Sequence, residues 1–136
     1  NQNHKEVISE PVVSYDLFPT IINVLNLSSS NKNIDGIDLS NLFINKEIER
    51  EFIFWHFPHY HGSLWKPGSA LRSSDWKLIE FYEDNRLELY NLKDDPGQLN
   101  PINDKNLIKK YKELMLREIK SYDPPKEVLK NYFKEI

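Results

Sequence analysis

The 136-residue sequence contains no cysteine. This absence excludes a disulfide framework, a thiolate metal site and a cysteine nucleophile within these residues. Glycine is also scarce, with four residues in the whole chain, and neither a phosphate-cradling glycine loop nor a G-x-S-x-G nucleophile elbow is present. The longest apolar runs, such as Phe52–Phe57, are far shorter than the roughly 18 to 20 residues of a membrane span. We therefore expect no membrane span and no catalytic residue of these classes.

The sequence also lacks a strong excess of either charge. It has 18 Lys and Arg residues against 21 Asp and Glu residues, a formal net charge of -3, and the two signs are interspersed. No broad positive field is available for nucleic acid or an anionic membrane, so we expect neither as a partner. Residues Asn1–Glu6 contain no initiator Met and no apolar signal segment, and we expect the chain to begin partway through a longer protein.

The apolar content is sufficient for a packed core, at 39% hydrophobic and 12% aromatic residues. Near the N-terminus, apolar residues at helical spacing predict a helix over about Leu17–Leu27 with Asp16 as its N-cap. Pro19 then lies in the first turn, where its missing N–H costs no hydrogen bond. If nothing in the chain covers the apolar face of this helix, which carries Phe18, Ile22 and Leu25, we expect that face to dock on a larger domain.

Extended segments follow residues 28–50, which are mostly connection with a short helical segment ending at Phe43. Aromatic and β-branched residues bounded by polar turns predict four strands and, from their order, an antiparallel meander. The predicted strands are Glu51–Phe57, Ala70–Arg72, Trp76–Tyr82 and Leu87–Leu92, and the longest loop spans His59–Gly68.

An apolar stripe with lysines and glutamates between its members predicts a long helix over Lys105–Tyr122. A second short amphipathic helix is expected after Pro124 and Pro125, on a stripe made of Val128, Leu129, Tyr132, Phe133 and Ile136. The predicted fold class is α+β: a small antiparallel sheet of about four strands packed against the long C-terminal helix, with an N-terminal helical arm. We place the arm and its connection at residues 1–48 and the sheet-and-helix domain at residues 49–136.

The densest group of polar and aromatic residues is Trp55–Gly62. Its histidines are a possible ligand set for zinc, copper or nickel, but no second cluster completes such a site, so we expect no metal here. Loops after strands commonly carry recognition, and His59, Tyr60 and His61 are therefore candidates for contact with a polar substrate. The alternative is structural, with the histidines serving hydrogen bonds, and core or rim packing is the expectation for Trp55 and Phe57.

Two basic residues, Arg72 and Lys77, fall close together on adjacent extended segments. A guanidinium can bind a sulfate or a carboxylate through two hydrogen bonds, so Arg72 is a further candidate for substrate binding. The alternative for both cations is a surface ion pair with Asp75, Glu80 or Glu88, and this is the expectation for Lys77.

Four ordered segments resemble the C-terminal part of arylsulfatase-type sulfatases, the formylglycine-dependent enzymes of the alkaline phosphatase superfamily. Ser14–Ile21 and Asp35–Leu39 resemble the family's D-hydrophobic-hydrophobic-P-T helix and its D-G-x-x-L segment. Ala70–Ile79 and Leu87–Gly97 resemble its C-terminal signature. Trp55–Gly62 resembles a variable W-H-x-P-H-Y segment that often borders the substrate pocket, and this favours His59, Tyr60 and His61 as substrate contacts.

The resemblance implies a large α/β domain with a calcium-bound formylglycine nucleophile, made from a Cys or Ser in a C/S-x-P-x-R motif, and a C-terminal subdomain that shapes the pocket. This chain has neither that motif nor the acidic calcium cluster, so we expect no catalytic residue and no cofactor in it. Residues 1–48 would belong to the end of the larger domain, which is the implied partner. The complete enzyme would hydrolyse sulfate esters of a sulfated small molecule or glycan, in the periplasm or outside the cell.

Two other functions stay open at this point. One is a non-catalytic carbohydrate-binding or interaction module, and the other is part of a related phosphate or phosphonate monoester hydrolase. The sequence also departs from the sulfatase pattern at Gln98, where the family commonly has Glu after D-P-G. Any cap made by that Glu would be weakened or replaced here.

Overall fold

A computed structural model describes residues 7–30 and 33–121 of the chain. Contacts between residues divide the chain into two units, Asn1–Glu51 and Phe52–Ile136. The predicted short helix that would contain Val128 and Tyr132 lies outside the described residues. No helix in the described part of the chain is both long and apolar enough to cross a membrane.

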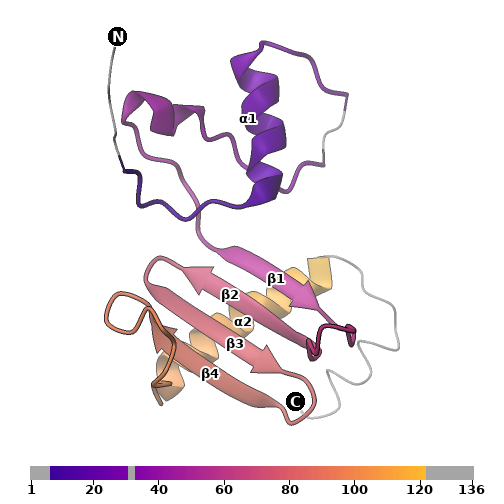
Figure 1. The fold of residues 1–136 in the computed structure, drawn as a ribbon, viewed down its shortest axis with the longest axis vertical. Helices are drawn as coiled ribbons and strands as arrows, with labels where there is room; N and C mark the ends of the chain where they lie inside the picture. The colour runs from indigo at the N-terminus through magenta and orange to yellow at the C-terminus, as the bar shows by residue number, and fades with distance from the viewer. Residues whose placement is uncertain (1–6, 31–32, 122–136) are drawn as a thin grey trace. The chain divides into compact units, whose positions relative to one another are not determined.

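The first unit contains a 3-10 turn, Ser14–Asp16, the helix α1, Leu17–Val24, and a second 3-10 turn, Ser40–Ile44 (Figure 1). The helix is shorter than predicted, because Asn26 adopts a left-handed φ of 51° and closes the chain back on the last turn. Asp16 precedes α1 but its side chain makes no capping bond to the helix, contrary to the prediction. Within the described residues, Phe18 and Leu25 of the apolar helix face are exposed and Ile22 is partly buried.

The carboxylate of Asp16 holds three separate segments of the first unit together. It accepts hydrogen bonds from the backbone N–H of Val13 at 2.9 Å and of Ile37 at 3.1 Å, and its Oδ2 lies 2.6 Å from Nη2 of Arg50. The Asp16 side chain is fully buried. Burial alone would raise the pKa of this carboxyl, but the bonds from Arg50, Val13 and Ile37 lower it overall. The buried charge is compensated by the guanidinium of Arg50 and by two backbone N–H donors.

The hydroxyl of Thr20 makes a second link between α1 and the Asp35–Leu39 segment. It donates to the carbonyl of Asp16 at 2.7 Å and accepts from the backbone N–H of Leu39 at 2.9 Å. The two segments approach so closely at Gly36 that an added Cβ would lie 2.2 Å from the carbonyl oxygen of Tyr15. Glycine is required there for space.

The second unit is a four-stranded antiparallel meander with the order β1-β2-β3-β4, which confirms the predicted α+β fold. The strands are β1, Ile53–Phe57; β2, Gly68–Ser73; β3, Trp76–Phe81; and β4, Arg86–Asn91, and the helix α2 spans Lys105–Ser121 (Figure 1). Ser74 and Asn85 take left-handed φ angles of 52° and 53° in the two tight turns that join β2 to β3 and β3 to β4.

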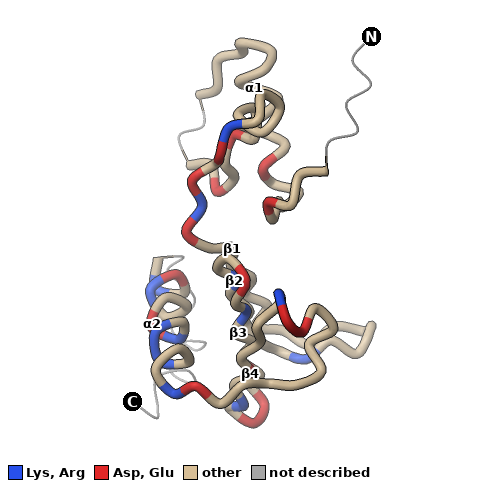
Figure 2. The backbone as a smooth tube through the Cα atoms, turned by 90° about the vertical axis from the view of Figure 1, so that its left-hand side faces the viewer, with Lys and Arg blue, Asp and Glu red and all other residues tan. Residues whose placement is uncertain are grey.

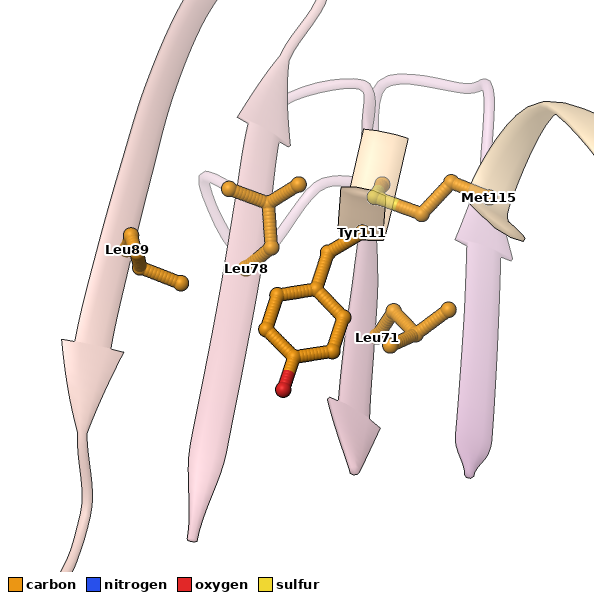
Figure 3. Packing of buried hydrophobic residues seen from close by; sticks show 5 residues of the cluster. All are labelled: Leu71, Leu78, Leu89, Tyr111 and Met115. Atoms are coloured by element: carbon orange, nitrogen blue, oxygen red, sulfur yellow. The ribbon is translucent and has the colours of Figure 1, made fainter. Parts of the chain in front are cut away.

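The core of the second unit lies between the sheet and α2. Leu71, Leu78 and Leu89 occupy one cross-strand row and point toward Tyr111 and Met115 of α2 (Figure 3). The three leucines and Met115 are completely buried, and each contributes about 1.5–3 kcal/mol of transfer free energy relative to an exposed side chain.

Because side chains alternate along a strand, this packing assigns the intervening residues to the opposite face of the sheet. Figure 2 shows α2, the one helix of the second unit within the described residues, along one face of the sheet, and the second unit places no described helix on the other. We call this other surface the helix-free face. Its cross-strand rows are Ile53, Arg72, Lys77 and Tyr90; Trp55, Ala70, Ile79 and Glu88; and Phe57, Gly68, Phe81 and Arg86.

We predict that Gly36→Ala destabilises the first unit by about 1–3 kcal/mol, since the new methyl group meets a backbone carbonyl that cannot rotate away. Hydrogen exchange should report the change as faster exchange of the Ile37 and Leu39 amides. Gly62→Ala is the matched control, because a Cβ at Gly62 meets nothing within 4 Å. Equal amide protection in the two variants would contradict the proposed close approach.

Candidate functional site

The loop that follows β1 is built around the ring of Phe57. Three aromatic rings meet this ring edge-on, with centroid separations of 6.1 Å for His59, 6.4 Å for His61 and 5.9 Å for Trp65. Edge-to-face packing of this kind holds rings in preferred orientations while leaving their outer edges open. Trp65 stays 65% exposed and both histidines are exposed, so the loop presents polar ring edges to its surroundings.

Backbone hydrogen bonds give the tip of this loop a defined turn. The N–H of Leu64 donates to the carbonyl of His61 at 3.0 Å, and the N–H of His61 donates to the carbonyl of Trp65 at 3.2 Å. The N–H of Ser63 donates to Nδ1 of His61 at 3.2 Å, which leaves Nε2 of His61 as the outward ring nitrogen. The structure therefore places two predicted site residues, His59 and His61, each against the ring of Phe57.

Tyr60 points to a different neighbour, the turn between β3 and β4. Its hydroxyl donates to Glu83 at 3.2 Å, and Lys66 lies 2.5 Å from the other oxygen of the same carboxylate. The bond to Glu83 raises the pKa of the Tyr60 phenol, and Lys66 lowers the pKa of Glu83. Tyr60 remains 72% exposed.

His56 lies on the face of the sheet that packs against α2. Its Nδ1 lies 2.8 Å from the hydroxyls of both Ser69 and Tyr82, which also contact each other, and its ring stacks at 12° on Phe54. Nε2 of His56 is buried and has no hydrogen-bond partner. Burial lowers the pKa of His56, the neighbouring His59 lowers it further, and Glu80 opposes the shift. We assign His56 to the packing of the sheet.

Arg72, the fourth predicted site residue, lies at the opposite end of the sheet from the loop. It pairs with Ile53 at the start of β1, whereas Phe57 at the end of β1 pairs with Gly68. Four residues of strand separate the two positions by about 13 Å. The structure thus brings His59, Tyr60 and His61 together and sets Arg72 apart from them.

The predicted ion pair of Lys77 does not form. Nζ of Lys77 donates to the side-chain oxygen of Gln98 at 2.7 Å, while Glu80 pairs with Lys112 of α2 and Glu88 pairs with Arg86. Gln98 therefore acts as an acceptor for Lys77. The turn cap comes from the carboxylate of Asp95, which accepts from the backbone N–H groups of Leu99 and Asn100.

Trp55 is more exposed than the predicted core or rim packing implies, at 41%. It separates two hollows on the helix-free face. One is apolar and is walled mainly by Phe57, Trp65, Ala70, Ile79 and Phe81. The other is polar and is lined by Arg72, Lys77, Leu92, Pro96 and Gln98. Sequence reasoning missed the second hollow because Gln98 reaches it from a loop that follows β4.

Within residues 7–30 and 33–121, no three His, Cys, Asp or Glu side chains gather in a way that could hold a metal ion. The described site is a set of exposed ring edges and charged groups.

Comparison with known proteins identifies one protein family and a group of similar folds. Residues 1–123 match the family described as N-sulphoglucosamine sulphohydrolase, C-terminal. A curated sulfatase of Formosa agariphila is 31% identical over 101 residues, which cover 66% of this chain and 18% of that protein. This chain therefore spans less than a fifth of the length of that relative.

Solved sulfatase structures share the fold of the chain. The structure of a protein in complex with its substrate, D-glucosamine-2-N,6-O-disulfate, matches 88% of this chain and 24% of its own, with a TM-score of 0.60 and 25% identity. A 2-O GAG sulfatase matches 87% of this chain and 25% of its own, with a TM-score of 0.56 and 19% identity. A putative sulfatase from Bacteroides thetaiotaomicron VPI-5482 matches 79% and 23%, with a TM-score of 0.56 and 22% identity.

The lowered pKa of His56 predicts a pH dependence of stability. Below about pH 6.5, the ordinary pKa of histidine, the unfolded chain binds a proton that the folded chain resists. The free energy of unfolding should therefore decrease as the pH is lowered from about 6.5, until the pH is below the folded-state pKa of His56. Urea unfolding between pH 5 and pH 7.5 measures this slope. His56→Asn, which keeps an acceptor near Ser69 and Tyr82, should flatten it, whereas His61→Asn should not. An unchanged slope in His56→Asn would contradict the assignment.

Proposed function

The chain belongs to the sulfatase family, as its C-terminal portion, and we propose that it completes the substrate pocket of an enzyme that hydrolyses sulfate esters on a sulfated sugar. The observation that carries the proposal is the family match over residues 1–123. The solved relative bound to a disulfated glucosamine supports the substrate class.

We propose His59, Tyr60 and His61 as the residues that touch substrate from this side of the pocket. Their exposed rings are held by Phe57 and Glu83, so they are positioned without being buried. Imidazole and phenol groups donate and accept hydrogen bonds, which suits the hydroxyl groups and the sulfate oxygens of a sulfated sugar. Such contacts orient a substrate and do not themselves cleave the ester.

We place the chemical step in the part of the enzyme that lies upstream of this chain. Calcium and a formylglycine nucleophile are the groups that the family implies, and the described residues contain no donor set for such an ion. The larger N-terminal domain is the proposed partner, and the apolar face of α1 is its proposed contact, since Phe18 and Leu25 are exposed. We propose a periplasmic or secreted enzyme.

The first test compares the 136-residue chain with the same chain joined to its native upstream sequence. We expect release of sulfate from a chromogenic aryl sulfate and from a glucosamine sulfate only by the joined form, because the chain alone lacks the nucleophile. Sulfate release by the isolated chain would contradict the assignment of the catalytic groups. Hydrolysis of a chromogenic aryl phosphate, but not of the aryl sulfate, by the joined form would favour a related phosphate monoester hydrolase.

The second test concerns the loop. In the joined form, His61→Asn keeps an acceptor for the N–H of Ser63 but removes the outward ring nitrogen, and Tyr60→Phe removes only the hydroxyl. Each variant should lower kcat/KM for a glucosamine sulfate roughly two- to tenfold, the value of one hydrogen bond. Ser63→Ala in the same exposed loop is the control. Unchanged kinetics in both variants would place the loop outside the pocket.

A further inference from the structure

Two cations of the helix-free face stand directly opposite each other. Arg72 of β2 pairs in register with Lys77 of β3, which places their Cβ atoms about 4.5–5.5 Å apart on the same face. Like charges in this position repel and destabilise a sheet. Among the described residues, neither side chain has a carboxylate oxygen within 4.0 Å. Within residues 7–30 and 33–121 the pair therefore lacks an acidic counter-charge.

The one strong partner of this pair is neutral. Gln98 accepts a hydrogen bond from Lys77 at 2.7 Å, and Arg72 makes only a long contact of 3.4 Å from Nε to the carbonyl of Ser74. The terminal guanidinium nitrogens of Arg72 are thus available for a bidentate contact, and Lys77 keeps further N–H donors. Gln98 positions the ammonium group without neutralising it.

These residues line a groove of about 290 Å³ together with Trp55, Leu92 and Pro96. This volume is at the lower end for small-molecule sites and suits a single ring with one anionic substituent. Trp55 supplies a flat apolar wall that is 41% exposed, and the cations supply donors for an anion. A sugar ring has an apolar C–H face and polar edges, so the groove offers a surface for each.

Trp55 also lines the apolar hollow described above. This hollow extends along the sheet from Trp55 to the loop after β1. Gly68 has no side chain between Phe57 and Phe81, and this opens the floor of that hollow. Arg72 in the groove and Phe57 at the base of the loop are therefore joined along one face of the sheet, about 13 Å apart along the strand.

We propose that the groove formed by Trp55, Arg72, Lys77 and Gln98 is a second subsite that binds the sulfate group of another residue in a sulfated oligosaccharide. The inference rests on the proposed function and deepens it, because it makes the substrate a chain of sugars. Arg72 would bind the sulfate through two parallel N–H···O hydrogen bonds, and Lys77 would add a positive charge. Trp55 would stack on the sugar ring that bears the sulfate.

Gln98→Glu tests the proposal with nearly no change of shape. A carboxylate at this position would pair with Lys77 and cancel part of the positive charge of the groove. In the full-length enzyme, we expect KM for a sulfated tetrasaccharide to rise about tenfold relative to KM for a chromogenic aryl sulfate, the value of one charge-assisted contact. Asn106→Asp is the control, since it adds the same charge on α2, an exposed position on the other face.

Calorimetric titration of the full-length protein with the tetrasaccharide tests the subsite separately from the proposed sulfatase activity. If the wild-type protein binds the tetrasaccharide and Gln98→Glu weakens binding, the subsite stands even where no sulfate is released. If Gln98→Glu stabilises the protein and leaves both KM and binding unchanged, the groove is overturned as a glycan site.

Discussion

The contact between the leucine row of the sheet and α2 sets the direction of every side chain in the second unit. Leu71, Leu78 and Leu89 must face Tyr111 and Met115 to leave water, and a strand that places one residue on this face places the next on the other. A slip of one residue would bury Arg72 and Lys77 under the helix and expose the leucines. The apolar core therefore determines where the cations of the helix-free face lie, although it does not touch them.

The first unit is held together in a different way. Its buried groups include the carboxylate of Asp16 and the hydroxyl of Thr20, which bind backbone N–H groups of the Asp35–Leu39 segment. Removal of either acceptor leaves buried donors unpaired, and each unpaired donor costs about 1–3 kcal/mol. This explains in physical terms why the D-x-x-P-T and D-G-x-x-L segments occur together in one chain. The first supplies acceptors at a four-residue spacing, and the second supplies the N–H groups and a glycine that permits the approach.

The meander and α2 were predictable because their signals are local: period-two strands, polar turns and an apolar stripe. The loop residues His59, Tyr60 and His61 are consecutive in the sequence. They were predictable as one group because consecutive residues stay in the same loop after folding. The misassignments concern pairings over a distance. Asp16 was expected to cap its own helix but binds Ile37 and Arg50, and Lys77 was expected to find a nearby carboxylate but reaches Gln98. Nothing in residue spacing indicates which of several acceptors a long or buried side chain will meet after folding.

The identity of residue 98 as glutamine determines the charge balance beside Lys77. Glutamate at this position would give Lys77 an ion pair, and the cross-strand pair of Arg72 and Lys77 would then carry one net charge. With glutamine the repulsion between the two cations remains, and burial together with Arg72 lowers the pKa of Lys77. Glutamate, which has the same shape as glutamine, would remove this repulsive energy. That the protein keeps the repulsion favours a role in which the positive charge of Arg72 and Lys77 binds an anion. An anion that enters the groove relieves the repulsion and accepts hydrogen bonds from both cations. Arg72 and Lys77 therefore destabilise the sheet when the groove is empty and stabilise it when an anion is bound.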